Sequence, residues 1–92
     1  MYRIVLTCSG VPIDEGAEAA SDITNEFGVH RAWHKNVSCQ RDGAQLILQA
    51  ENDFDSQGLA LQDEFSDCLS AYIVKPFDGQ ICIHSMVKTG GT

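Results

Sequence analysis

Three histidines, His30, His34 and His84, are the side chains best suited to proton transfer near neutral pH. We take His34 and His84 as candidate catalytic residues of an enzyme that would use a cavity between sheet and helices or between subunits. Neither histidine has a second polar group at a spacing in the sequence that would let the two act together, and this counts against catalysis.

The same histidines form no evident metal site. His30 and His34 lie in a segment expected to be a strand, where residues four apart are separated by ~13 Å, too far to share one ion. Cys82 and His84 share a face of the last expected strand, so two such pairs would meet only in an edge-to-edge dimer. We therefore expect no resident metal and no cofactor.

A small anion is the ligand that the loop 9–12 could bind. Backbone N–H groups at the start of the following helix favour negative charge. In the expected topology two basic side chains lie at the same end of the sheet, so the candidate ligand-binding residues are Ser9, Gly10, Arg41 and Lys75. Asp14 and Glu15 favour the alternative, an ordinary turn in which the helix caps itself.

Four widely spaced cysteines, none in a CxxC pair, give no support for a zinc ribbon or a thioredoxin-like site. Each lies in an apolar stretch, and the apolar run at the start of the chain is too short for a signal peptide. We expect reduced, buried thiols in a cytoplasmic protein. The four are Cys8, Cys39, Cys68 and Cys82.

Net charge is −7, from 6 basic and 13 acidic residues among 92. Such a surface repels phosphate backbones, and no polybasic patch is present, so we expect neither nucleic acid nor membrane as a partner. A hydrophobic fraction of 43% with scattered charge is typical of one folded domain.

The positions of these residues depend on the elements that carry them. Residues 2–8 are β-branched and apolar, which predicts a strand, and a turn at 9–12 interrupts it. Apolar residues then recur every three or four positions, which predicts a helix that begins near Asp14 and ends at Gly28. Its apolar stripe is Ile13, Ala17, Ala20, Ile23 and Phe27.

The middle of the chain predicts a hairpin. Residues 29–40 and 44–51 are the expected strands, and the turn at 41–43 places a glycine where positive φ is needed. A loop at 52–56 ends in residues suited to capping a helix.

The last third repeats the pattern of helix and strand. The second helix carries one apolar face, and Pro76 and Asp78 end that region. Residues 80–88 predict the last strand by alternation, residues 1–88 a single domain, and 89–92 a flexible tail. The apolar face of the helix is Leu61, Phe65, Cys68, Leu69 and Tyr72.

The order is therefore strand, helix, strand, strand, helix, strand. Two amphipathic helices can cover one face of a four-stranded sheet. The right-handed crossover rule favours an α+β ferredoxin-like βαββαβ sandwich, with an antiparallel sheet in the order 4-1-3-2 and both helices on one face. The alternative is a different strand order with the same two helices.

Strand alternation sorts the side chains between the two faces. The set expected to face the helices is Ile4, Leu6, Val29, Trp33, Val37, Leu46, Leu48, Ile81 and Ile83. The set expected on the opposite face is Val5, Thr7, His34, Asn36, Gln45, Ile47, Gln49, Cys82, His84 and Met86. Apolar residues among polar ones there favour a covering partner, for which a second copy in a two-fold homodimer is the commonest form. A solvated face with no partner is the alternative.

Two resemblances follow from length, element order and the glycine-containing loop 9–12. The chain resembles ACT-like regulatory domains, which implies a non-catalytic binding or regulatory module that acts as a dimer around a small ligand or protein partner. It is also similar to dimeric α+β barrel enzymes, which implies the alternative, a small enzyme. A metal or redox protein that uses Cys82 with His84 is a third hypothesis.

Overall fold

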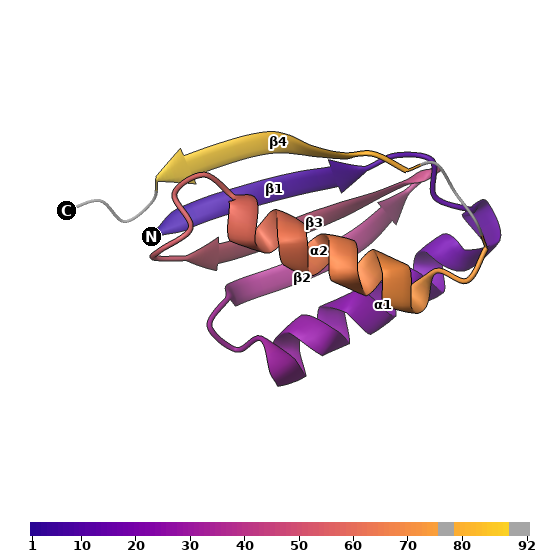
Figure 1. Cartoon of the computed structure of the whole chain (residues 1–92), viewed down its shortest axis with the longest axis horizontal. Helices are drawn as coiled ribbons and strands as arrows, with labels where there is room; N and C mark the ends of the chain where they lie inside the picture. The colour runs from indigo at the N-terminus through magenta and orange to yellow at the C-terminus, as the bar shows by residue number, and fades with distance from the viewer. Residues whose placement is uncertain (76–78, 89–92) are drawn as a thin grey trace.

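The computed structural model describes residues 1–75 and 79–88, which form six elements in the expected order (Figure 1). They are β1 (Tyr2–Cys8), α1 (Ile13–His30), β2 (Lys35–Asp42), β3 (Gln45–Asn52), α2 (Leu59–Tyr72) and β4 (Ile81–Lys88). The expected break at Pro76 and Asp78 and the expected tail at 89–92 lie outside the described residues.

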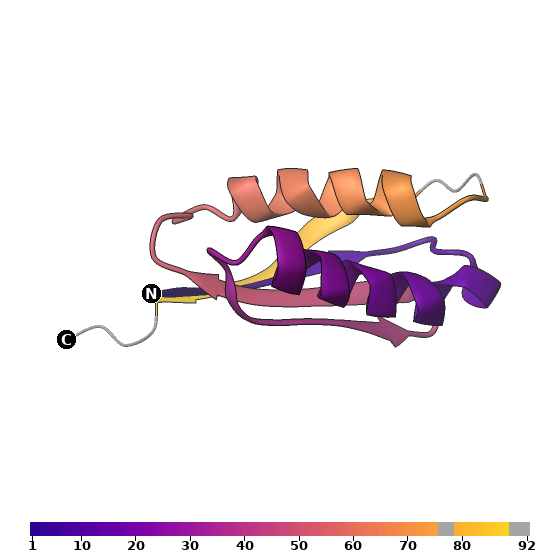
Figure 2. The same ribbon diagram turned by 90° about the horizontal axis from the view of Figure 1, so that it is seen from below.

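The strands pair antiparallel in the sheet order β2-β3-β1-β4, which is 4-1-3-2 counted from the other edge. The expected ferredoxin-like fold is therefore confirmed. Figure 2 shows both helices on the same side of the sheet. None of the elements in 1–75 and 79–88 covers its other face.

Helix α1 continues past Gly28, so the expected helix end at that glycine is wrong. It runs to His30, and the N–H of Arg31 still bonds the carbonyl oxygen of Phe27 at 3.1 Å. A glycine permits a helix stop without enforcing one. Ile13 is 66% exposed, so the buried side is shifted from the expected stripe and consists of Gly16, Ala19, Ala20, Ile23 and Phe27.

Residues 29 and 30 complete α1, and residues 31–34 form a turn. The strand expected from residue 29 therefore begins only at Lys35. A hydrogen bond from the N–H of His34 to the carbonyl oxygen of Arg31 (3.1 Å) closes the turn. Val29 and Trp33, expected in the core, are exposed, while His34, expected on the open sheet face, is buried. The segment has no dominant hydrophobic period, so tertiary contacts decide its conformation.

The connection between β2 and β3 is the two-residue turn Gly43-Ala44 rather than the expected 41–43. Arg41 and Asp42 remain in the ladder, opposite Leu46 and Gln45. Gly43 has a φ of 61°, so the expectation that a glycine supplies positive φ there is confirmed.

A bulge in β4 overturns the expected position of Met86. Ile83 pairs with Leu6 and Ser85 pairs with Val5, which leaves His84 as the extra residue. The insertion reverses the alternation beyond it, so Met86 pairs with Ile4 and packs against the core on the helix side.

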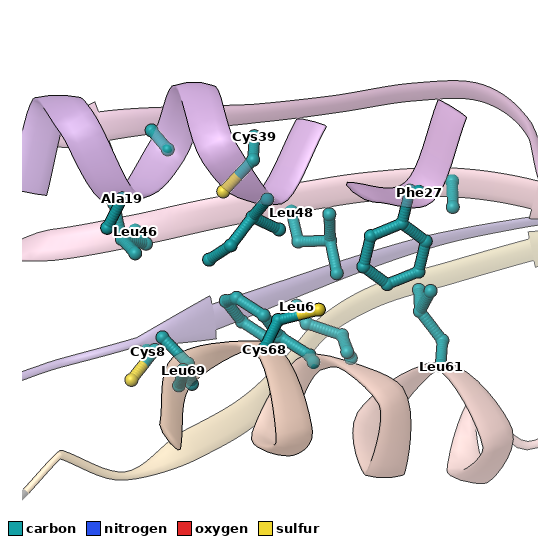
Figure 3. Close-up of a cluster of buried hydrophobic side chains, with 14 of the residues drawn as sticks. Leu6, Cys8, Ala19, Phe27, Cys39, Leu46, Leu48, Leu61, Cys68 and Leu69 are labelled. Carbon is teal, nitrogen blue, oxygen red and sulfur yellow. The ribbon is translucent and has the colours of Figure 1, made fainter. Parts of the chain in front are cut away.

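The core lies between the helices and the sheet (Figure 3). The expected core residues Ile4, Leu6, Leu46 and Leu48 are fully buried there. The helices contribute large buried side chains to the same core. They are Phe27 from α1 and Leu61, Phe65 and Leu69 from α2. Within the described residues, no helix has the length and apolar character needed to cross a bilayer.

Candidate functional site

A chain of side-chain hydrogen bonds runs through the buried imidazole of His34. Its Nε2 lies 2.9 Å from Oε1 of Glu64 on α2, and its Nδ1 lies 3.2 Å from Nδ2 of Asn52, the last residue of β3. Nη1 of Arg31 donates to Oε2 of Glu64 at 3.1 Å. This cluster of Arg31, His34, Asn52 and Glu64 therefore ties the turn after α1 to α2 and to the end of β3.

The orientation of Asn52 fixes the protonation of His34. Oδ1 of Asn52 accepts the N–H groups of Phe54 (3.2 Å) and Asp55 (2.8 Å), so the amide presents its NH2 group to the imidazole. Nδ1 must then accept, and the ring proton lies on Nε2, where it is donated to Glu64. The network thus holds a neutral imidazole in one tautomer with both nitrogens bonded.

Aromatic rings enclose the imidazole on its remaining sides. The ring centroids of Phe27, Trp33 and Phe54 lie 5.5, 6.0 and 6.0 Å from that of His34. The guanidinium of Arg31 also stacks over Phe27, 5.8 Å from its centroid. Trp33 and Phe54 are half exposed, so the cluster supports two aromatic side chains at the surface.

The loop after β3 caps α2, as the sequence analysis expects. Asp55 is buried, and its carboxylate accepts the N–H groups of Ala60 (3.2 Å) and Leu61 (2.9 Å) at the start of the helix. Gly58 holds a φ of 75°, and a side chain there would approach Met86 and Ile4. The position of this loop thus depends on Asn52 at one end and on α2 at the other.

The four residues expected to bind a small anion lie around the first turn of α1. The N–H of Ser9 bonds Gln80, and Gly10 has a φ of 72°. Arg41 lies across Gly16, where an added Cβ would be 2.7 Å from its Cδ. Arg41 and Lys75 therefore both lie beside the first turn of α1, at Gly16 and Asp14, and the anion site itself stays a prediction.

Carboxylates of the chain already occupy part of that region. Lys75 pairs with Asp14, and the carboxylate of Glu15 accepts the N–H groups of Val74 (2.9 Å) and Lys75 (3.1 Å). The hydrogen bond with Lys75 lowers the pKa of Asp14, and the same bond raises the pKa of Lys75. A ligand anion would therefore compete with Asp14 for Lys75.

Cys82 departs from the expectation of four buried thiols, because it lies exposed on edge strand β4. Cys8, Cys39 and Cys68 are buried, and all four are free. Burial raises the pKa of Cys8 and of Cys68, and it raises the pKa of Cys39 to about 12. The three buried thiols stay protonated at neutral pH and are poor nucleophiles.

We expect one fast thiol per chain in highly dilute, native protein treated with a disulfide reagent at pH 8. Cys82 reacts first, and the three buried thiols react only as the protein unfolds. Raising the pH to 9 leaves Cys39 unreactive in the native protein, because burial raises the pKa of its thiol to about 12. Stopped-flow absorbance measures the phases. A fast phase that survives Cys82→Ser would contradict the assignment.

The other two histidines lie apart from the cluster. His30 is the last residue of α1, so the expectation that His30 and His34 lie on one strand is wrong. Its Nε2 lies 4.0 Å from Oε2 of Glu26, one helical turn earlier. His84 is exposed at the bulge of β4. The two catalytic candidates thus lie in different environments, one enclosed by protein groups and one open to solvent.

Arg31, Asn52 and Glu64 were not expected from the sequence to form a site with His34. One signal was available for Glu64, because it falls with Leu61, Phe65 and Cys68 at the spacing of a buried helix face. An acidic residue in such a stripe needs a partner. No pattern indicates that the partner is His34, which is 30 residues away.

In comparisons with protein-family models, curated proteins and solved structures, no match to the chain was found. Over residues 1–75 and 79–88, no group of three or more His, Cys, Asp or Glu side chains is placed to hold a metal ion, and no pocket is found.

Proposed function

We propose that the protein is a non-catalytic binding module that works as a homodimer, paired through the face of the sheet that the helices leave open. The observation that carries the proposal is the distribution of charge between the two faces. Both helices carry mainly acidic charge: Asp14, Glu15, Glu18, Asp22 and Glu26 on α1, and Asp63, Glu64 and Asp67 on α2.

The open face is close to neutral. Its carboxylates are those of Glu51 and Asp42, against the basic side chains of Arg3 and Lys35. Glu51 is 3.9 Å from Arg3 and accepts hydrogen bonds from Asn36 at 3.2 and 3.3 Å, and Asp42 accepts one from Gln45 at 3.5 Å. Lys35 pairs with Glu51 across the strands. Two copies with a net charge of −7 each meet with least repulsion through this surface.

Apolar side chains lie on the two central strands of this face. Val5 and Ile47 are half-buried in the single chain, and Thr7 is the cross-strand partner of Ile47. Val87, on the adjacent edge strand opposite Arg3, is 51% exposed. This strip gives a second copy an apolar centre surrounded by glutamine, serine and threonine, the usual pattern of a protein interface.

The same geometry supports binding better than catalysis by His34. Both ring nitrogens of His34 are bonded to protein groups, so neither is free to exchange a proton with a substrate. The alternative, a small enzyme of the dimeric α+β barrel kind, would depend on His84.

A small anionic ligand beside Ser9, Gly10 and Arg41 is compatible with the binding module. Four free thiols fit the reducing cytosol as its compartment.

Replacing Ile47 with glutamate tests the interface. In a two-fold dimer each copy then brings a charge to the centre of the contact, which weakens dimerisation by at least about 100-fold. Sedimentation equilibrium of wild type and Ile47→Glu measures the change, and circular dichroism checks folding. The matched control is Leu59→Glu on α2, where the residue is 57% exposed on the helix side. Equal dimerisation of Ile47→Glu and wild type would refute this interface.

A further inference from the structure

We propose that His34 is a proton-controlled switch that acts through Asn52 on the loop between β3 and α2. The loop carries Phe54 at the surface and Asp55 at the start of α2. The inference concerns the opposite side of the molecule from the open sheet face, and it holds whether or not the protein dimerises.

The first step is a conflict between donors. In the neutral state the Nδ2 group of Asn52 donates to Nδ1 of His34 at 3.2 Å. A proton added to the imidazole goes to Nδ1, the one ring nitrogen without a hydrogen, and both groups then point N–H bonds at each other. With His34 fully enclosed, no water can take over either donor.

The second step is the way in which the conflict can be relieved. A half-turn of the Asn52 amide brings Oδ1 to the new Nδ1–H and creates a good hydrogen bond. The same half-turn takes Oδ1 away from the N–H groups of Phe54 and Asp55, at present 3.2 and 2.8 Å away. One amide cannot satisfy both sets, so protonation of His34 releases the start of the loop.

Charged groups from several elements lie around the ring. Glu64 on α2 faces Nε2 at 2.9 Å, and Arg31 from the turn after α1 pairs with that carboxylate at 3.1 Å. The Asp55 carboxylate is held by the N–H groups of Ala60 and Leu61. Glu51 of β3 is held by Asn36 of β2. From α1, Phe27 presents only its ring.

The released loop has a visible consequence at the surface. Phe54 and Trp33 both contact the His34 ring and are 52% and 51% exposed. A loop freed from Asn52 moves Phe54 relative to Trp33. The switch therefore alters the aromatic surface that the cluster supports, and protons act as its ligand.

Nuclear magnetic resonance of the wild-type protein between pH 8 and pH 5 tests the switch. The ring signals of His34 and the backbone amide signals of Phe54 and Asp55 are expected to move with one common midpoint. The emission of Trp33, the single tryptophan of the chain, should change at the same midpoint. Amides of Phe54 and Asp55 that stay fixed while His34 titrates would overturn the proposal, as would a ring that stays neutral to pH 5.

Two variants separate the switch from general effects of acid. Asn52→Asp offers oxygens to the imidazolium and to both N–H groups at once, so the coordinated movement of Phe54 and Asp55 should disappear. In His84→Gln, which changes an exposed histidine, the movement should be unchanged. Persistence of the full movement in Asn52→Asp would also overturn the proposal.

Discussion

Replacing Asn52 with alanine is expected to lower the free energy of unfolding by roughly 3 kcal/mol. Asn52 is 1% exposed and makes three hydrogen bonds, to Nδ1 of His34 and from the N–H groups of Phe54 and Asp55. Alanine leaves all three groups without their partner. The bonds to His34 and Asp55 are buried and the bond to Phe54 is partly buried, and each orphaned group costs about 1 kcal/mol or more. Urea denaturation followed by circular dichroism measures the loss.

The matched control is Asn25→Ala on α1, because Asn25 is an exposed helical residue. Alanine is the better helix former there, so the change should lie within about 0.5 kcal/mol of wild type. A loss at Asn52 no larger than that at Asn25 would show that Asn52 does not hold the loop.

Phe27→Ala is expected to cost more, about 4 kcal/mol, because a buried ring is removed and a cavity remains. Phe27 is 0% exposed, and Figure 3 shows its ring directed toward Leu61 of α2. It also packs against His34 and Arg31, so the loss weakens the core and the polar cluster together. For a domain of this size the melting temperature should fall by roughly 20 °C.

Phe54→Ala is the control for aromatic truncation, since that ring is 52% exposed. It should lose about 1 kcal/mol or less, as exposed positions do. Calorimetry of both variants gives the comparison. Similar melting temperatures for Phe27→Ala and Phe54→Ala would contradict the burial on which the account of the cluster depends.

Sequence patterns predicted the fold where the periods were strong. Residues 2–8 are a strand with the expected bounds, and the buried side of α2 is the expected one at Leu61, Phe65, Cys68 and Leu69. Residues 2–8 are largely apolar, and in α2 apolar residues recur every three or four positions, so the buried side of that helix follows directly from the period.

The patterns failed where a single residue changes the local geometry. The bulge at His84 adds one residue to β4 and turns Met86 to the other side, and no side-chain type announces such an insertion. Around residue 30 the polarity is mixed, so neither period dominates and the docking of Arg31 and His34 decides.

The polar cluster was beyond sequence reasoning for a different reason. His34 meets Asn52 across 18 residues and Glu64 across 30. Contacts at such separations depend on the finished fold, and each residue by itself has an ordinary explanation. Only the three-dimensional structure shows that these side chains satisfy one another.

The measurement that tests the central claim most directly is native mass spectrometry of untagged wild-type protein over a range of concentrations. The account predicts a species of twice the 10.0 kDa chain mass that dissociates on dilution and is lost in Ile47→Glu. A chain that stays monomeric at the highest soluble concentration would contradict pairing through the open face of the sheet.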